Sequence, residues 1–280
     1  MDRAIGTDSR RWEDEVEEGG VEVALGCREG YEIHGALGGG GRNFEGYGLE
    51  TGTRVVIKFA DRRNPEIHEG ERTILARLRH PRIVRLVDTE ERGAPFNVME
   101  YVNGSDLDNV LAALGSLPYE RAINIFLDLC DPVQYLDERG LVHRDIKPGN
   151  IILDQEREGS PVLADFGLCR DLKTVGKSGG TIFYAPPEQI HGKEIDHRSD
   201  VYAIGASLYH TVTGRTPYNG DATVARRTGR TRPDLVRFDP RAVEGIPEAL
   251  LGVISRTTSY SPADRYKSAK EMGEALTRLK

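Results

Sequence analysis

The sequence predicts an α+β fold in two lobes, a small lobe rich in β-strands and a larger lobe that is mainly helical. From residue 31 to about residue 102, short β-like runs alternate with turn residues and are interrupted by one helical stretch. From residue 103 onward, apolar residues recur at helical spacing instead. With 280 residues the chain is long enough for two lobes that share a core, and residues 1–30 are expected to precede them as an acidic extension.

Five runs in the first lobe are typical of β-strands, and the Thr-Gly pair at 51–52 supplies a hairpin turn. The runs cover residues 31–37, 44–49, 53–59, 84–88 and 96–101. The helical stretch begins after Asn64, a favourable N-cap, with Pro65 at the first helical position. In the second lobe, apolar stripes that predict helices cover residues 122–136, 201–212 and 269–279.

Glu71 lies on the apolar stripe of the first-lobe helix, and a carboxylate on a buried face requires a partner. The natural candidate is Lys58, which ends a β-run in which alternation places Val56 and Lys58 on one face. Glu69 is a weaker alternative partner for this lysine. Lys58 could also be an ordinary edge-strand lysine without such a role.

The composition is that of a soluble globular chain, with 38% hydrophobic and 30% charged residues. The three cysteines are scattered, which favours a reducing, cytoplasmic setting over a disulfide framework or a CxxC metal site. No apolar run approaches the roughly 18 residues that span a membrane, so no membrane partner is expected. The net charge of -7, to which nine acids and four bases in residues 1–30 contribute -5, argues against an extended nucleic-acid interface.

The most informative segment is His-Arg-Asp-Ile-Lys-Pro-Gly-Asn at residues 143–150, followed by Asp-Phe-Gly at residues 165–167. Short apolar runs flank both motifs, so the polar residues are expected at strand ends, where a rigid scaffold presents loops to a cleft. Asn150 and Asp165 offer oxygen ligands that suit a hard ion such as magnesium. Asp145 remains available as a base.

With these motifs, the chain resembles the eukaryotic-type (Hanks-type) serine/threonine protein kinase family from about Tyr31 to Lys280. The resemblance implies a bilobal protein-kinase-like fold whose catalytic domain covers residues 31–280. Its N-lobe would comprise residues 31–102, with one key helix, and its C-lobe residues 103–280.

The same resemblance assigns roles to the residues of the central motifs. Asp145 would accept or orient the proton of the attacking hydroxyl, and Asn150 and Asp165 would hold magnesium, or manganese, on the phosphates of ATP. Lys147 looks like the phosphate-contacting lysine of the members that act on serine and threonine. Asp200 would brace the catalytic loop.

The glycine-rich segment departs from the family pattern G-x-G-x-x-G. Gly38 and Gly40 occupy the first two glycine positions, and Asn43 occupies the third. Glu45 falls where an apolar residue usually covers adenine, although a shift of one residue would place Phe44 over the base instead. Phosphate binding by backbone N–H groups is still expected, and these departures could reduce the affinity for the nucleotide.

Two further contacts with ATP follow from the resemblance. Lys58, paired with Glu71, would be positioned on the α and β phosphates. The backbone groups of Glu100 and Val102 would hydrogen-bond adenine at the hinge between the lobes.

The segment after residue 165 resembles an activation segment. Arg144 supplies a cation that could bind a phosphate on Thr174 or Ser178, and we therefore expect autophosphorylation in this segment. Glu188, which closes the segment, would pair with Arg265. Both residues of that pair would be structural.

The function expected on these grounds is transfer of the γ-phosphoryl group of ATP to serine and threonine hydroxyls of protein substrates, as part of signalling. Two alternatives stay open at this point. One is a nucleotide-binding, pseudokinase-like scaffold, which Asn43, Glu45 and Val56 favour. The other is a small-molecule phosphotransferase with a distantly related fold, for which Lys147 and the Pro-Pro-Glu at residues 186–188 would be unusual.

Overall fold

The computed structural model describes most of the chain, with gaps. The described residues are 26–28, 30–37, 42–61, 63–91, 95–172, 181, 183–217 and 243–280. Of the residues that we singled out in the sequence, Gly38, Gly40, Thr174 and Ser178 lie outside the described ranges.

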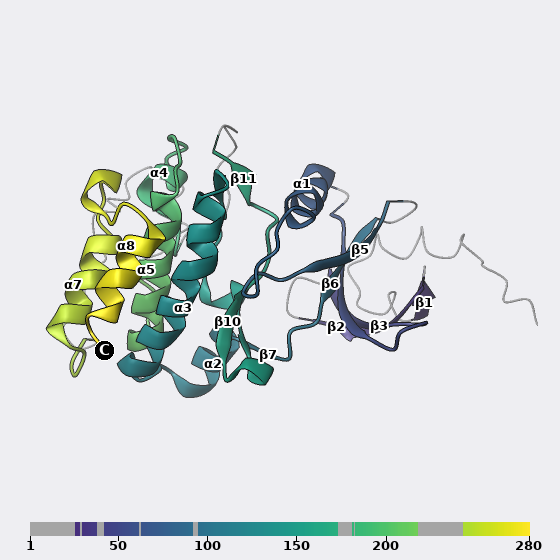
Figure 1. The fold of residues 1–280 in the computed structure, drawn as a ribbon, viewed down its shortest axis with the longest axis horizontal. Helices are drawn as coiled ribbons and strands as arrows, with labels where there is room; N and C mark the ends of the chain where they lie inside the picture. The colour runs from purple at the N-terminus through teal and green to yellow at the C-terminus, as the bar shows by residue number, and fades with distance from the viewer. Residues whose placement is uncertain are drawn as a thin grey trace, which may run out of the picture. The chain divides into compact units, whose positions relative to one another are not determined.

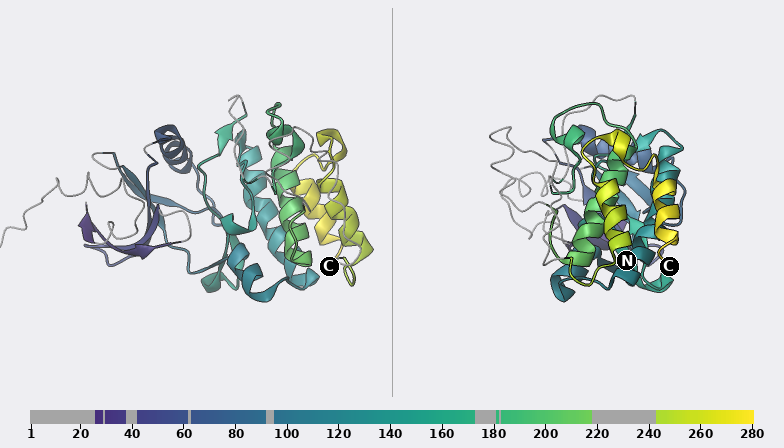
Figure 2. Two further views of the ribbon diagram at one scale, coloured as in Figure 1. Left: turned by 180° about the vertical axis from the view of Figure 1, so that it is seen from behind. Right: turned by 90° about the vertical axis from the view of Figure 1, so that its left-hand side faces the viewer.

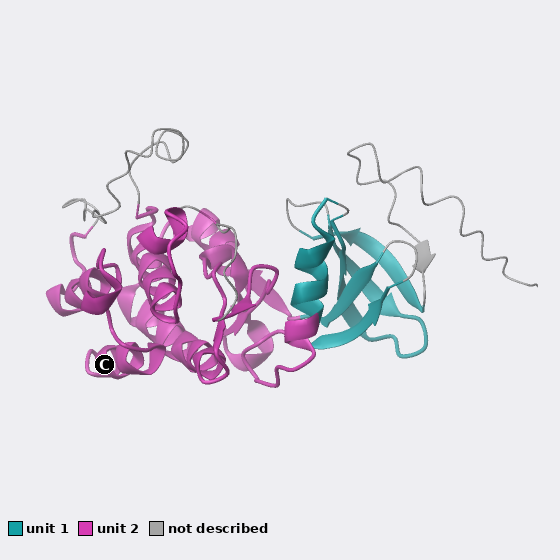
Figure 3. Cartoon of the chain, turned by 90° about the horizontal axis from the view of Figure 1, so that it is seen from above, with its two compact units in different colours: residues 1–72, 85–101 teal, residues 73–84, 102–280 magenta. Residues whose placement is uncertain are grey.

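The chain divides into two compact units (Figure 3). Unit 1 consists of residues 1–72 and 85–101, and unit 2 consists of residues 73–84 and 102–280. A segment of twelve residues from the N-terminal half, residues 73–84, therefore belongs to the larger unit. The boundaries that we predicted for the catalytic domain and its lobes stay a prediction.

Unit 1 is built on one antiparallel sheet of six strands in the order β1-β2-β3-β4-β6-β5 (Figure 1). The strands are β1 (Gly26–Arg28), β2 (Tyr31–Ala36), β3 (Asn43–Gly48), β4 (Arg54–Phe59), β5 (Leu86–Glu90) and β6 (Phe96–Glu100). The helix α1 (Pro65–Leu75) begins at the proline predicted to start it. Gly52, with φ of 63°, forms the predicted hairpin turn between β3 and β4, because glycine adopts positive φ without strain.

The predicted strands of this sheet are all present, and the observed sheet differs from the prediction at two strands, β1 and β5. β1 pairs with β2 inside the segment expected to be an extension, so the sheet starts before residue 31. β5 begins at Leu86 instead of Val84, because the N–H of Val84 donates to the carbonyl of Leu163, in unit 2.

The two faces of the β3–β4 hairpin carry different residues. Phe44 pairs with Ile57, and both are buried in the apolar core of unit 1. Glu45 pairs with Val56 on the opposite face, which also carries Lys58. The alternative in which Phe44 covers the base is therefore wrong, because the alternation of a strand turns its side chain into the core.

Unit 2 is mainly helical. Its helices are α2 (Leu107–Leu114), α3 (Tyr119–Asp137), α4 (Pro187–Ile190), α5 (Arg198–Thr213), α7 (Glu248–Thr257) and α8 (Ala269–Thr277). α3 packs against α5 and α8, and α5 packs against α7. The view from behind shows α5, in green, beside α3, in teal (Figure 2). The three stripes predicted in the sequence form α3, α5 and α8. In the described part of the chain, none of the helices is long and apolar enough to cross a membrane.

Two small antiparallel sheets lie on the helices of unit 2 and carry the loops of interest. One has the strand order β10-β9-β7 and the other pairs β11 with β8. Their strands are β7 (Gly104–Asp106), β8 (Leu141–Val142), β9 (Ile151–Asp154), β10 (Ser160–Leu163) and β11 (Arg170–Asp171). The motif at residues 143–150 lies between β8 and β9, and the motif at 165–167 follows β10. The prediction that both motifs lie at strand ends is confirmed.

Candidate active site

In unit 1, Lys58 of β4 and Glu71 of α1 form an ion pair. Lys58 Nζ lies 2.8 Å from Glu71 Oε1, and the side chains are 20% and 1% exposed. Removing one partner of such a pair would leave a charge in a desolvated position, which is costly. Glu69, the alternative partner, is exposed on the same helix. The expected contact is therefore present with Glu71, and it directs the ammonium group of Lys58 to one place on the sheet.

The loop of unit 2 at residues 143–150 is held by one buried carboxylate. Asp200, in the first turn of α5, accepts the backbone N–H of His143 at 2.7 Å and that of Arg144 at 3.0 Å. Burial raises the pKa of Asp200, and the two N–H groups and the nearby imidazole of His143 oppose this. Arg144 has φ of 69°, a costly conformation for a residue with a side chain. The contacts of Asp200 hold this strained turn, as the resemblance implied.

Asp145 follows the strained turn and accepts hydrogen bonds on both carboxylate oxygens. Oδ2 accepts from Lys147 Nζ at 2.7 Å and from Asn150 Nδ2 at 3.1 Å. Oδ1 accepts the backbone N–H of Thr181 at 2.9 Å and its hydroxyl at 3.2 Å. The side chain is 10% exposed, so the carboxylate is fixed in direction by these groups. Such a carboxylate is suited to orient a hydroxyl group that approaches it.

Thr181 is a site residue whose role the sequence did not predict. Its hydroxyl accepts from Lys147 Nζ at 2.8 Å while donating to Asp145, so it bridges the cation and the anion of the loop. The contact joins residues that are 36 positions apart. No local pattern in the sequence indicates that Thr181 meets the loop of Asp145.

Asn150 and Asp165 come together through the β9–β10 hairpin. The N–H of Ala164 donates to the carbonyl of Asn150 at 2.9 Å, which extends the pairing of Leu163 with Ile151 by one residue. Asp165, with φ of 59°, is the next residue after this contact. The two side chains that the sequence selected as oxygen ligands are therefore positioned by the backbone of a single hairpin.

The donor set at this hairpin fits a magnesium ion. Asn150 uses its amide nitrogen on Asp145, both on the carbonyl at 2.8 Å and on the carboxylate, which turns its amide oxygen the other way. That oxygen and the carboxylate of Asp165 are hard donors, and magnesium is bound by one or two protein groups plus phosphates and water. Among the described residues, no group of three or more His, Cys, Asp or Glu side chains is placed to hold a metal ion.

Arg144 lies half-buried beside a second cation. Burial lowers the pKa of its guanidinium, and the charge of Arg170 lowers it further, while Asp200 opposes both. A guanidinium donates charge-assisted hydrogen bonds to a phosphate, as the role predicted for Arg144 requires. Thr174 and Ser178, the hydroxyls expected to receive that phosphate, lie outside the described residues.

Glu100, one of the two residues predicted to contact adenine, is the last residue of β6, and Val102 follows two positions later. The N–H of Glu100 donates to the carbonyl of Arg85 at 3.0 Å, so this group is used within the sheet of unit 1. Val102 belongs to unit 2, as its second segment begins at this residue. Their predicted contacts with adenine stay a prediction.

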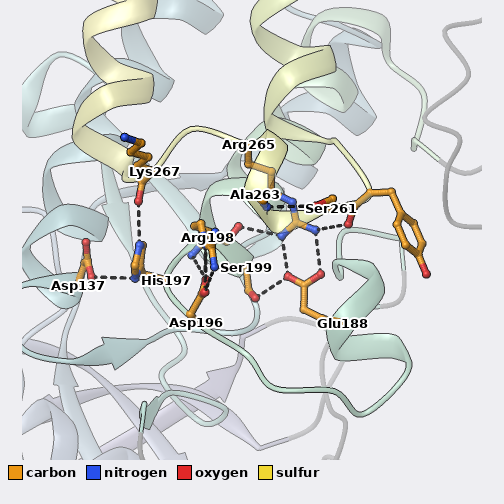
Figure 4. Close-up of polar contacts among 11 residues, drawn as sticks. Asp137, Glu188, Asp196, His197, Arg198, Ser199, Ser261, Ala263, Arg265 and Lys267 are labelled. Atoms are coloured by element: carbon orange, nitrogen blue, oxygen red, sulfur yellow. Dashed lines mark hydrogen bonds and ion pairs between the residues drawn. The ribbon is translucent and has the colours of Figure 1, made fainter.

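The segment that ends at Glu188 is attached to unit 2 by a buried ion pair (Figure 4). Arg265 Nη1 lies 2.6 Å from Glu188 Oε1, and Nη2 donates to Oε2 at 2.8 Å. The side chains are 0% and 7% exposed. Ser199 Oγ donates to the same carboxylate at 2.7 Å. The predicted pairing of Glu188 with Arg265 is confirmed as a contact, and its two parallel bonds give it a fixed geometry.

A second contact of this segment was not expected from the sequence. The hydroxyl of Tyr184 lies 2.7 Å from His210 Nδ1 on α5. Burial raises the pKa of Tyr184 and lowers that of His210, so both groups are neutral at pH 7. The segment between Thr181 and Glu188 is thus attached to α5 as well as to Arg265.

The region of this chain that is similar to known proteins includes the residues of the site. The family model "Protein kinase domain" matches residues 31–275. The serine/threonine-protein kinase PknB of Mycolicibacterium smegmatis is 36% identical over 216 residues, which are 73% of this chain and 34% of that protein. The PknB of Mycobacterium leprae is 33% identical over 268 residues, 89% of this chain and 43% of that protein.

A relative from another genus gives the same result. The probable serine/threonine-protein kinase CPE1738 of Clostridium perfringens is 32% identical over 235 residues, 80% of this chain and 34% of that protein. The chain thus spans between about a third and two fifths of the length of these curated relatives.

Proposed function

Because this chain belongs to the protein kinase family, we propose that it is a serine/threonine protein kinase, which transfers the γ-phosphoryl group of ATP to hydroxyls of protein substrates. The observation that carries the proposal is the cluster around Asp145, in which Lys147, Asn150 and Thr181 all donate to one carboxylate. A fixed carboxylate beside a lysine and two metal-binding oxygens is what in-line phosphoryl transfer requires.

Each residue of unit 2 has a task in this reaction. Asp145 accepts the hydrogen bond of the substrate hydroxyl and directs its oxygen toward the phosphorus atom. Lys147 places a positive charge beside that oxygen, where it stabilises the γ-phosphate as negative charge redistributes during transfer. Asn150 and Asp165 would hold magnesium, which neutralises the phosphate oxygens when it is bound.

Unit 1 would contribute a lysine that binds the phosphates of the nucleotide. Lys58, held by Glu71, would contact the α and β phosphates of ATP. The glycine-rich segment with Gly38 and Gly40 would contribute backbone N–H groups. The roles of these residues are part of the proposal.

The acceptor and the setting complete the proposal. The acceptors are serine and threonine side chains of proteins, in keeping with the names of the relatives. They include Thr174 or Ser178 of this chain. Of the cysteines whose side chains the structure describes, Cys130 and Cys169 are free thiols, which supports a reducing compartment such as the cytoplasm.

A transfer assay with radiolabelled ATP, magnesium and a serine/threonine peptide array tests the activity. We expect phosphate on peptides with the wild-type chain and a loss of at least 1,000-fold with Asp145→Asn, which keeps the size of the side chain but removes its charge. Thermal stabilisation by ATP and magnesium without any transfer by the wild-type chain would contradict the proposal and favour a nucleotide-binding scaffold. Transfer to small molecules alone would favour the phosphotransferase alternative.

A further inference from the structure

The face of unit 1 that carries Lys58 also carries a charged pair. In β4, side chains at 54, 56 and 58 share one face, and the register pairs Val56 with Glu45 and Lys58 with Asn43. A nucleotide whose phosphates reach Lys58 must lie along this face. Its base would then meet Glu45, a residue with a carboxylate where an apolar contact is needed.

The carboxylate of Glu45 is held by two donors on this face. Arg54 Nε donates to Oε1 at 2.7 Å, and the hydroxyl of Tyr47 donates to the same oxygen at 3.1 Å. The hydrogen bond from Arg54 lowers the pKa of Glu45, more than burial raises it, so the group is charged at pH 7. The charge is therefore present and has a fixed direction.

That direction is away from the phosphate end of the site. Glu45 lies opposite Val56, and its carboxylate reaches Arg54, two residues toward the start of β4, whereas Lys58 is two residues toward the end. With a rise of about 3.3 Å per residue, the backbones at positions 54 and 58 are about 13 Å apart. The carboxylate thus points opposite to the lysine that would bind phosphate.

Arg54 is itself positioned by an aromatic ring. Its guanidinium carbon lies 3.6 Å from the centroid of the Tyr101 ring, just after β6. A guanidinium stacked on a ring in this way is attracted by the π electrons and keeps its orientation. β3, β4 and the residue that follows β6 therefore contribute to one polar cluster, which consists of Glu45, Tyr47, Arg54 and Tyr101.

We propose that Arg54 is a positioning residue for nucleotide binding, which draws the carboxylate of Glu45 aside so that only the methylene stem of Glu45 covers the base. The inference rests on the proposed function, because it places a nucleotide on this face. Long charged side chains commonly bury their stems while the charged end reaches a polar partner. The pair would thus take the place of an apolar residue at position 45.

The physical consequence of losing Arg54 follows from charge. Without the guanidinium, the carboxylate of Glu45 is held by the Tyr47 hydroxyl alone and is free to turn over the base, where its burial is costly. It would also approach the phosphates, which carry the same sign of charge. The loss of affinity would depend on Glu45, and this dependence distinguishes positioning from a direct contact of Arg54 with the nucleotide.

A double-mutant cycle with ATP affinity as the readout tests the inference. We expect Arg54→Ala to raise the KM for ATP at least 5-fold while kcat changes less than 2-fold, because only binding is affected. In a Glu45→Val background, the same Arg54→Ala change should alter the KM less than 2-fold. Glu45→Val alone should leave the KM unchanged or lower it.

A matched control separates this effect from a change in net charge. Arg85→Ala removes an exposed arginine of unit 1 that pairs with Glu100 at 3.5 Å, and it should leave the KM for ATP within 2-fold. Thermal midpoints of all variants report on folding. An equal rise in KM on Arg54→Ala in both backgrounds, or no rise in either, would overturn the inference.

A failure of this inference can be told apart from a failure of the proposed kinase activity. If the wild-type chain transfers no phosphate, the same four proteins are titrated with ADP and magnesium by calorimetry. A coupling of Arg54 with Glu45 in the dissociation constant would support the inference while the kinase activity fails. A wild-type chain that binds no nucleotide would overturn both.

Discussion

Breaking the ion pair between Glu188 and Arg265 should destabilise unit 2 strongly. Arg265 makes five hydrogen bonds: two to the Glu188 carboxylate and one each to the carbonyls of Ser259 at 2.8 Å, Tyr260 at 3.1 Å and Arg198 at 3.1 Å. With its side chain 0% exposed, no water can replace these partners in the native packing. Arg265→Met keeps most of the volume and removes every donor.

The magnitude follows from what remains buried. Among the described residues, Glu188, 7% exposed, would keep only the hydroxyl of Ser199 as a side-chain hydrogen-bond partner. Removing one member of a buried ion pair costs about 3–5 kcal/mol, because the other charge stays in a desolvated position. For a chain of this size about 2–4 °C is lost per kcal/mol, so the thermal midpoint should fall by about 10 °C.

Circular dichroism during heating measures this shift, and an exposed pair supplies the control. Arg256 pairs with Glu271 at 3.1 Å, with side chains 47% and 34% exposed. Arg256→Met should therefore cost less than about 1 kcal/mol. Adding Glu188→Gln to Arg265→Met should recover part of the stability, because it removes the uncompensated charge. Equal shifts for the two arginine variants would refute the reasoning.

Three further predictions concern the catalytic loop and the core. Asp200→Asn replaces one acceptor by a donor that faces a backbone N–H, and it should lower kcat at least 10-fold with an unchanged KM for ATP; an unchanged kcat would contradict the bracing role. Thr181→Val should lower kcat at least 10-fold, whereas Thr181→Ser, which keeps the hydroxyl, should stay within about 3-fold in the same steady-state assay. Burial raises the pKa of Cys130 to about 12, so iodoacetamide at pH 9 should label it only after unfolding, as read by mass spectrometry. The folded state holds the thiol proton of Cys130 more tightly than the unfolded state, in which the pKa of the thiol is about 8.5. The contribution of this thiol to the free energy of unfolding is therefore complete below about pH 8.5 and is lost as the pH rises toward 12.

Local patterns were sufficient to predict much of unit 1. The stripe of α1 placed Glu71 on a buried face, and the alternation of β4 placed Lys58 on the face where the two meet. Both inferences need only the period of one element and the cost of an unpaired charge. The strand bounds were predicted to within about two residues for the same reason, since apolar alternation and turn residues are local signals.

Contacts between distant segments could not be predicted in this way. The bridge from Thr181 to Asp145 joins residues 36 positions apart, and no period in the sequence encodes such a contact. The direction of the Glu45 carboxylate depends on the register of β3 with β4, because only that register brings Arg54 within reach. The strand β1 is three residues long and carries too short a pattern to be recognised.

The anchoring of the catalytic loop to α5 has a consequence for how this protein tolerates mutation. Thirteen of the sixteen residues of α5 are buried, and Gly205 lies so close to Thr257 on α7 that an added methyl group would fall 2.0 Å from its hydroxyl. Asp200 transmits the position of this helix directly to the strained turn at Arg144. Substitutions deep in the core, such as Gly205→Ala, should therefore reduce turnover at temperatures where the protein is still folded, so that activity would decline across a library of core variants before stability does.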